Sequence, residues 1–244
     1  MKGRIIQNQF NIMSFGLLLF IIFSCEKEDN KPEIVKDIFT DPRNNYVYAT
    51  VKIGNQTWMA ENLKYLPVVS GPDSGSASMN IKPYNYVYDY YGTSVTEAKS
   101  TNNYKEYGVL YNWPAANEAC PSGWHLPSQE EWQELIDYIE SNGYELKAGK
   151  ALKSSHDWNE NVGGSDNFGF SALPGGYRGC FYTYFFSSGY YGFDYMGEVV
   201  YFWTCTVYDK HDLWCRLLVS GYDGIYQSAY YYDEGICVCC IKDN

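Results

Sequence analysis

The sequence predicts an α+β domain of an exported protein, and three observations lead to this fold class. The first ordered segments have the alternation of a β-hairpin, the clearest helix lies in the middle of the chain, and the last third is a run of strands and turns. Strands that follow helices, without regular βαβ alternation, are typical of α+β folds. With 244 residues, the chain is long enough for one large domain with a sizeable core.

The N-terminal segment, residues 1–24, has the features of a secretory signal peptide. Lys2 and Arg4 precede an uncharged apolar run that ends at Phe23. This run is shorter than the about 20 residues that a membrane-spanning helix needs. The four residues that end at Cys25 are similar to the bacterial lipobox, although Phe23 is bulkier than the residue usual there. The resemblance implies that Cys25 is acylated and becomes the first residue of the mature chain.

Residues 25–38 are polar and charged, and we interpret them as a lipidated tether. The acidic cluster after Cys25 resembles the export signal of some outward-facing bacterial lipoproteins, but a plain solvated linker has the same composition. We therefore expect an outer membrane lipoprotein and leave exposure at the cell surface open. Loss of Lys2 and Arg4 with the signal peptide changes the formal charge from −11 to −13. An acidic chain repels nucleic acid, so the expected partner is the membrane, through the lipid anchor.

The predicted domain spans residues 39–244 and opens with a hairpin. Tyr46–Ile53 alternates between two sets of side chains, a Gly-Asn pair offers a turn, and Gln56–Leu63 forms the returning strand. Residues 70–104 are rich in Gly, Ser, Asn and Tyr and have weak periodicity. We expect a long excursion there with one short strand, Tyr84–Tyr90.

The central helix has the strongest local signals. Ser128 is a good N-cap, and Glu131 three residues later completes a capping box. One apolar face follows at helical spacing and consists of Trp132, Leu135, Ile136 and Ile139. The Asn-Gly pair at 142–143 ends the helix. Shorter helices are expected over Trp113–Ala119 and Leu146–Lys153.

The chain after these helices is predicted to consist of strands and turns, because aromatic and β-branched residues are frequent there. Five strands are expected, over Phe168–Leu173, Val199–Thr206, Leu213–Val219, Ile225–Tyr231 and Ile236–Lys242. Abundant Gly, Asn, Ser and Asp suit the turns between them.

Five motifs occur in a fixed order along the chain: Lys52–Leu63, Gly108–Trp113, Cys120–Pro127, Gly169–Arg178 and Gly235–Asp243. Together they resemble the Fibrobacter succinogenes major paralogous domain family of exported bacterial proteins. That family is similar in fold to the C-type lectin-like group, which includes the formylglycine-generating enzymes. The resemblance implies a hairpin that joins the termini, two to three helices and small antiparallel sheets with long loops. It implies no established activity.

The seven cysteines that remain after Cys25 cannot all pair within one chain. An exported chain meets oxidising conditions, so disulfides are expected. The family resemblance implies one between Cys120, which precedes the central helix, and Cys240 on the last strand.

The other cysteines leave alternatives open. Strand alternation places Cys237 and Cys239 on one face, where Cys205 or Cys215 of a neighbouring strand could pair with either, and Cys180 has no assigned partner. A reactive pair at Cys205 and Cys215 would suit an enzyme of the formylglycine-generating type. The spacing does not match that group, however, and no activating base is evident. Structural disulfides with buried free thiols are the simpler interpretation.

No catalytic residue, metal site or cofactor is predicted. The three histidines are scattered along the sequence, so none lies near the cysteines at 237–240 to complete a zinc site. Trp158–Glu160 resembles the Trp-Asn-Asp run of calcium-dependent lectins, but its partner motif is absent and calcium needs about six to eight oxygens. We expect His125 to be a core residue. Glu61 and Arg178 are expected to be structural, and a pairing between them in the core is left open.

Two tyrosine-rich segments are the candidate binding surface, in loops around residues 181–195 and 222–233. Tyrosine among serine and glycine is typical of antibody paratopes, and aromatic rings also stack on sugars. Structural packing of these aromatics is the competing interpretation. The candidate binding residues are Tyr182, Tyr184, Phe185, Tyr190, Tyr191, Tyr195, Tyr226, Tyr230 and Tyr231.

The predicted function is a lipid-anchored module for binding or adhesion at the cell envelope, with a glycan or a protein as its ligand. Two other functions stay open on the sequence alone. One is an enzyme of the formylglycine-generating type, which requires an exposed and reduced cysteine pair. The other is a structural subunit of a surface assembly.

Overall fold

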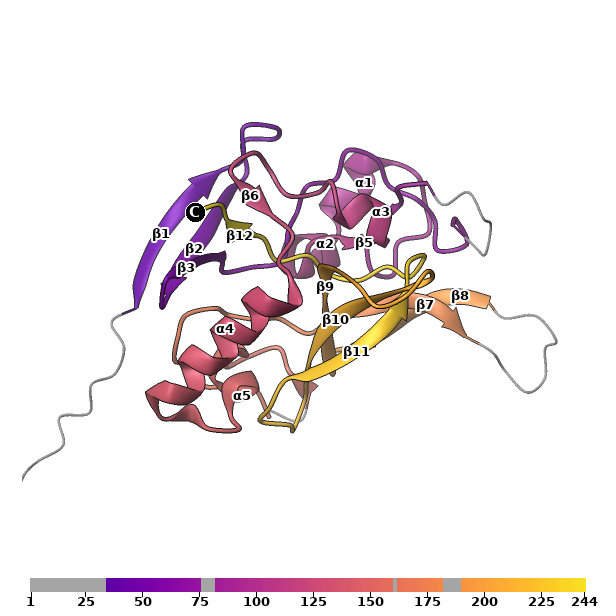
Figure 1. Ribbon diagram of the computed structural model, residues 1–244. Helices are drawn as coiled ribbons and strands as arrows, with labels where there is room; N and C mark the ends of the chain where they lie inside the picture. The colour runs from indigo at the N-terminus through magenta and orange to yellow at the C-terminus, as the bar shows by residue number, and fades with distance from the viewer. Residues whose placement is uncertain (1–33, 76–81, 160–161, 182–189) are drawn as a thin grey trace, which may run out of the picture. The chain divides into compact units, whose positions relative to one another are not determined.

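The chain forms an α+β fold, as its sequence predicts (Figure 1). The computed structural model describes residues 34–75, 82–159, 162–181 and 190–244. The signal peptide, Cys25 and three candidate binding residues lie outside them, namely Tyr182, Tyr184 and Phe185. Among the described residues, no helix has the length and apolar character needed to cross a bilayer.

The first sheet contains the first and the last strand of the described chain. Its order is β1 (Val35–Thr40), β2 (Val47–Ile53), β3 (Gln56–Met59), β12 (Ile241–Lys242) and β6 (Trp124–His125), with all neighbours antiparallel. β2 and β3 form the predicted hairpin, and its turn holds Gly54 at a φ of +61°. A β-carbon at Gly54 would be strained and would meet the ring of Tyr138, so the turn requires glycine.

β1 begins earlier than the predicted start of order at Phe39, so the last four residues of the predicted tether belong to the sheet. Five of its six side chains are exposed. The strand therefore has no buried face, and no period-2 hydrophobic pattern reveals it in the sequence. Backbone pairing with β2, from Val35 opposite Lys52 to Thr40 opposite Val47, holds β1 at the sheet edge.

The second sheet is built from the C-terminal half of the chain. Its order is β11 (Tyr226–Tyr231), β10 (Asp212–Val219), β9 (Val199–Val207), β7 (Gly175–Phe181) and β8 (Tyr190–Met196). Three of these strands, β9, β10 and β11, match predicted strands and pair antiparallel, whereas β7 and β9 are parallel. β7 and β8 were not predicted, because glycine weakens the strand pattern of both. Two short strands, β4 (Asn85–Tyr86) and β5 (Leu110–Tyr111), form a third sheet.

The central helix α4 (Gln129–Ile139) has the predicted capping box. Ser128 Oγ accepts from the backbone N–H of Glu131, and the Glu131 carboxylate accepts from the backbone N–H of Ser128. The predicted apolar face is buried, and a π-helical turn, η1 (Glu140–Tyr144), follows with Gly143 at a φ of +93°. The flanking helices are shorter than predicted, α3 (Trp113–Ala116) and α5 (Ala148–Leu152).

Residues 70–104 contain more helix than predicted. α1 (Val95–Ser100) and α2 (Asn102–Tyr107) begin after the N-caps Ser94 and Thr101. Each helix has six residues, too few for a helical hydrophobic pattern to be recognised. The predicted strand over Tyr84–Tyr90 is reduced to the two residues of β4.

Two other predicted strands are mostly irregular backbone, although their residues are largely buried. Phe168, Phe170 and Ala172 are buried, but the segment makes only a single bridge, between Ala172 and Lys153. Ile236–Lys242 is a strand only at its last two residues, β12. Before that, it makes single bridges to β5 and to β9, since it passes from the second sheet to the first.

An aromatic cluster joins the two sheets. The ring of Trp132 on α4 lies 4.9 Å from Trp58 of β3 and 5.5 Å from Phe202 of β9, centre to centre. Phe170 lies 5.8 Å from both tryptophans. All four side chains are buried, so α4 packs between the sheets through the largest apolar surfaces that a core can use.

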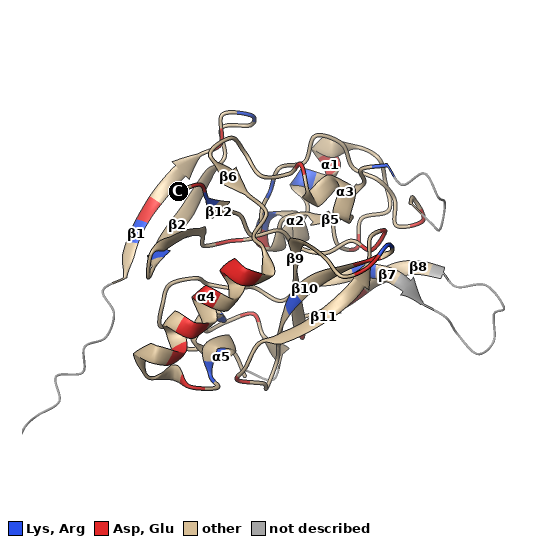
Figure 2. Cartoon of the chain, viewed as in Figure 1, with Lys and Arg blue, Asp and Glu red and all other residues tan. Residues whose placement is uncertain are grey.

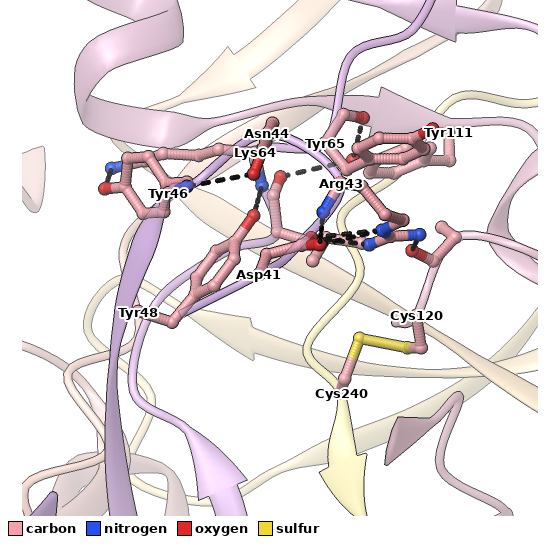
Figure 3. A network of polar contacts seen from close by, with 12 residues as sticks. Asp41, Arg43, Asn44, Tyr46, Tyr48, Lys64, Tyr65, Tyr111, Cys120 and Cys240 are labelled. Carbon is pink, nitrogen blue, oxygen red and sulfur yellow. Dashed lines mark hydrogen bonds and ion pairs between the residues drawn. A yellow bond between two sulfur atoms is a disulfide. The ribbon is translucent and has the colours of Figure 1, made fainter. Parts of the chain in front are cut away.

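A polar network connects the turn after β1 to the disulfide (Figure 3). Asp41 is fully buried, and its Oδ2 accepts from Nη2 of Arg43 at 2.7 Å. Nη1 of Arg43 donates to the carbonyl oxygen of Ala119 at 2.8 Å, next to Cys120. Cys120 and Cys240 form the disulfide that the family resemblance implied, with their Cα atoms 5.9 Å apart. The expected bridge is thereby confirmed.

Candidate functional site

The free cysteines that the structure describes do not form a reactive pair. Cys215, Cys237 and Cys239 are buried, and Cys205 is exposed. Burial raises the pKa of Cys237 to about 12, and burial also raises the pKa of Cys205. A thiol that stays protonated at neutral pH is a poor nucleophile. The pairing of Cys205 or Cys215 with Cys237 or Cys239, which the sequence left open, does not occur.

Glu61 and Arg178 do not pair with each other, a contact that the sequence had left open. Arg178 is fully buried, donates to three backbone carbonyls, and lies between the rings of Tyr86 and Tyr191 at 4.7 and 4.0 Å. Glu61 instead lies 3.1 Å from Nζ of Lys64. Each charge is satisfied in its own part of the domain, so both residues are structural.

His125 lies at the edge of the core, where the sequence predicted a core residue. Its Nε2 is 2.8 Å from Glu131 and its Nδ1 is 2.6 Å from Asp243. Burial lowers the pKa of His125, but the hydrogen bonds to Asp243 and Glu131 outweigh it, and the pKa is raised overall. The imidazole therefore connects α4 to the C-terminal segment.

Metal ligands do not gather anywhere in the part of the chain that the structure describes, where no group of three or more His, Cys, Asp and Glu could hold an ion. Trp158, the first residue of the run that resembles a calcium motif, is buried. Nζ of Lys153 lies 5.0 Å from the Trp158 ring, so this tryptophan packs in the interior.

Four tyrosines form a series of ring contacts across the second sheet, and we name Tyr177, Tyr195, Tyr201 and Tyr230 the tyrosine ladder. The centre of the Tyr177 ring lies 5.7 Å from Tyr195 and 5.0 Å from Tyr201, and Tyr201 lies 5.3 Å from Tyr230. Tyr177 and Tyr201 lie on the neighbouring strands β7 and β9, whereas the contact between Tyr201 and Tyr230 passes over β10, so these rings share one face of the sheet. The ladder therefore runs from the edge strand β8 to the opposite edge strand β11.

The tyrosine ladder is buried in its middle and more exposed toward its ends. Tyr201 is 5% exposed, whereas Tyr195 is 41% exposed. At the other end of β11, the exposed Tyr226 stacks on Tyr222, with ring centres 4.2 Å apart. Tyr226 is four residues from Tyr230 in the same strand and so lies on the same face. β9 and β11 contain no charged residue, whereas β10 between them contains Asp212 and Arg216 (Figure 2).

Glu234 adds a protonated carboxyl group to the interior side of the tyrosine ladder. Burial raises the pKa of Glu234 to about 8, Asp233 acts in the same direction, and Arg178 opposes it. Oε2 of Glu234 is buried without a hydrogen-bond partner among the described residues. Burial, followed by the charge of Glu234, raises the pKa of Tyr177. Because the carboxyl group is mostly neutral at pH 7, it does not place a full negative charge beside the tyrosines.

Three of the predicted binding residues lie on one face of the second sheet. Tyr195 and Tyr230 belong to the tyrosine ladder, and Tyr226 extends the same face. Tyr195 lies in β8, so its placement in a loop is wrong, because the surrounding glycines and serines concealed the strand pattern. Tyr226 and Tyr230 lie in β11, which matches the predicted strand Ile225–Tyr231.

The other described candidates lie elsewhere. Tyr191 packs on Arg178, with its ring centre 4.0 Å from the guanidinium carbon. Tyr231 is exposed and stacks on His211, with ring centres 6.4 Å apart. Tyr190 is paired through its backbone at the start of β8. The structure thus divides the predicted surface into the ladder face and a second cluster near His211.

A pocket of about 580 Å³ lies beside this second cluster, where the turn between β9 and β10 meets α3. Its apolar walls are Trp113, Pro114, Val207, Leu213 and Tyr232, and we name it the Trp113 pocket. Its volume falls within the roughly 300–1,000 Å³ typical of small-ligand sites.

Backbone hydrogen bonds hold the aromatic walls of the Trp113 pocket in place. The N–H of Trp113 donates to the carbonyl of Tyr232 at 2.9 Å, and the N–H of Tyr232 donates to the carbonyl of His211 at 3.2 Å. The indole Nε1 of Trp113 donates to the carbonyl of Thr204 at 3.2 Å. The Trp113 ring is therefore oriented before any ligand arrives.

The rim of the Trp113 pocket is polar and consists of the exposed residues Asp209, Lys210 and His211. Oδ1 of Asp209 accepts from the backbone N–H groups two and three residues later, at 2.8 and 3.0 Å. These hydrogen bonds lower the pKa of Asp209, so the carboxylate is ionised at neutral pH. Leu213 of the pocket wall pairs with Tyr230 across the sheet, and the pocket therefore adjoins the tyrosine ladder.

Residues 51–242 match the Fibrobacter succinogenes major domain. The chain belongs to this family. The match begins within β2 and extends to β12, so it leaves out β1 but includes the whole second sheet, the disulfide, the tyrosine ladder and the Trp113 pocket. No curated protein and no solved structure matches the chain. For this member of the major domain family, function must therefore be argued from its own geometry.

The Trp113 pocket and two ladder residues were missed by sequence reasoning. The pocket walls come from α3, from the turn between β9 and β10, and from the end of β11, which are far apart in the chain. No local pattern reveals such a combination. Tyr201 carried a usable signal, since it lies in a predicted strand, but its neighbour Tyr177 lies in glycine-rich β7.

Proposed function

We propose that this member of the major domain family is a lipid-anchored module of the cell envelope that binds a glycan or a protein through the tyrosine ladder face. One observation carries the proposal: tyrosine ring contacts cross the second sheet, and the aromatic surface emerges at its ends as Tyr195 and Tyr226, 41% and 46% exposed. Large rings left in water are typical of surfaces that a partner covers. Tyrosine also offers a hydroxyl group, so such a face suits ligands that are partly polar.

The lipid anchor of the proposal rests on the lipobox-like run that ends at Cys25. Incorporation of labelled palmitate into the full chain in a bacterial host tests it. We expect labelling of the natural chain and loss of the label in Cys25→Ser. Equal labelling of both would exclude Cys25 as the acylated residue.

We also propose a C-type lectin-like arrangement for the domain. It is supported by the sheet that combines β1 and β2 with the last strand, β12, and by the separate second sheet beyond α4. An experimentally determined structure of the full chain, compared strand by strand with that group, tests the assignment. A different strand order around the shared first sheet would contradict it.

The binding function is tested on an array that displays glycans together with envelope proteins, probed with the purified full chain with and without calcium. We expect binding to at least one of the two classes, and a several-fold weaker signal for Tyr195→Ala and for Tyr226→Ala. Leu146→Ala, which removes a 76% exposed side chain outside the tyrosine face, is the matched control and should bind normally. No binding to either class, or binding that neither tyrosine variant weakens, would refute the proposal.

A further inference from the structure

We propose that the Trp113 pocket is a binding site for one sugar ring of a neutral glycan. The inference rests on the proposed binding function, and it adds the position of a first contact and the chemical class of the ligand. It concerns residues that the tyrosine ladder does not include, and it is tested separately from the ladder.

The walls of the pocket suit the apolar faces of a sugar ring. Trp113 and Tyr232 supply two aromatic rings from adjacent backbone segments, and Leu213 closes the pocket floor at 5% exposure. The indole N–H of Trp113 is already bound to the carbonyl of Thr204, so the ring presents carbon and not an unsatisfied donor. A wall that is oriented before binding loses less conformational freedom when the ligand arrives.

The rim of the pocket selects the charge of the ligand. Asp209 is an ionised acceptor, and Lys210 next to it is a cationic donor. A purely apolar ligand would remove both charges from water without replacing their hydrogen bonds, which is unfavourable. Lys210 would repel a cation, and Asp209 would repel an anion, as would the formal charge of −11 on the whole chain. A neutral ligand whose hydroxyl groups both donate and accept satisfies both residues.

The neighbourhood of the pocket also suits a ligand longer than one ring. Leu213 in the pocket wall pairs directly with Tyr230, which is the residue that β11 contributes to the tyrosine ladder. The exposed Tyr231 and His211 stack at the same end of the sheet. A glycan chain that places one ring against Trp113 therefore has further aromatic surface within reach.

The test is calorimetric titration of the full chain in detergent with four neutral tetrasaccharides, built from glucose, mannose, xylose and N-acetylglucosamine. We expect at least one of them to bind. Trp113→Ala should weaken that binding about tenfold or more, as expected for an aromatic contact in a pocket. Tyr91→Ala, which removes a 65% exposed tyrosine outside both the pocket and the ladder, is the matched control.

A second variant keeps the test meaningful if Trp113→Ala folds poorly. Lys210 is exposed, so Lys210→Ala should fold normally and still weaken sugar binding, while Lys52→Ala on β2 should not. If none of the four tetrasaccharides binds, or if the pocket variants bind as well as the natural chain, the pocket inference is overturned. The proposed function survives these results as long as Tyr195→Ala and Tyr226→Ala weaken binding on the array, so the two failures are distinct.

Discussion

Removal of the disulfide measures how far the second sheet depends on covalent closure of the chain. Cys120 and Cys240 are 120 residues apart, and the loop they close contains α4, α5 and all five strands of the second sheet. In the chain-entropy model, closing a loop of this length stabilises the fold by roughly 5 kcal/mol at 25 °C. Alanine is the appropriate replacement, because Cys240 is fully buried and a serine hydroxyl there would need a partner.

The assay is thermal unfolding of the full chain, followed by tryptophan fluorescence and circular dichroism. For a domain of this size, 1 kcal/mol corresponds to about 2–4 °C in Tm, so the double variant Cys120→Ala/Cys240→Ala should unfold roughly 10–20 °C lower. Reducing agent should lower the Tm of the natural chain toward that of the double variant. Cys205→Ala, which alters an exposed free thiol, should stay within about 0.5 kcal/mol of the natural chain.

Two results would refute this reasoning. A loss below about 2 kcal/mol would mean that the reduced, unfolded chain is already compact, so that closure removes little entropy. A Cys205→Ala effect as large as that of the double variant would assign the loss to altered thiol chemistry instead of loop closure.

Three further variants test ionisable side chains of the domain, and each is measured as a change in Tm. Arg178→Met should cost about 3–5 kcal/mol, because the three backbone carbonyls of Pro72, Ser74 and Asp233 then lose their buried donor. A loss under 1 kcal/mol, within the range of a surface change, would contradict the structural role. The pKa of His125 is raised in the folded state, so its contacts stabilise the fold below the unfolded pKa of about 6.5, and this stabilisation is lost as pH rises through the folded pKa. His125→Ala should therefore lower the Tm more at pH 5.5 than at pH 8.5. Equal losses at both pH values would contradict a stabilising role for the charged imidazole. Burial raises the pKa of Glu234 to about 8, so its carboxyl group does not destabilise the fold in acid but destabilises it increasingly as pH rises. Glu234→Gln should therefore raise the Tm at pH 8 but not at pH 4. A change in Tm that is the same at both pH values would disprove the raised pKa.

The parts of the fold that could be predicted have their causes close together in the sequence. Ser128 and Glu131 form the capping box three residues apart, and Gly54 forms the tight turn of the β2–β3 hairpin. β1 was not predictable in the same way, because five of its six side chains are exposed and only Phe39 packs on the core, so backbone pairing with β2 defines the strand. Phe168–Leu173 shows the opposite error, since burial in irregular backbone imitates the alternation of a strand.

For the candidate site, the sequence predicts which residue types take part but not which side chains touch. Tyr195, Tyr226 and Tyr230 stand out because tyrosine is dense around them, but the density does not say which rings meet. Contact depends on strand order, and the parallel pairing of β7 with β9 is what brings Tyr177 beside Tyr201. The Trp113 pocket depends on three segments that no local pattern relates, so it appears only in three dimensions.

The position of the proposed anchor gives a mechanical reason to place recognition on the second sheet. If Cys25 carries the lipid, a load on the chain enters the domain at β1, which is held mainly by its backbone pairing with β2. Such a load separates an exposed edge strand before it disturbs a buried one. Ile38 of β1 is 67% exposed and could itself suggest a docking surface, but a partner bound there would pull directly on the strand that bears the load. The Trp113 pocket and the tyrosine ladder belong to strands that do not include β1, and the disulfide secures the last segment of the chain independently of it.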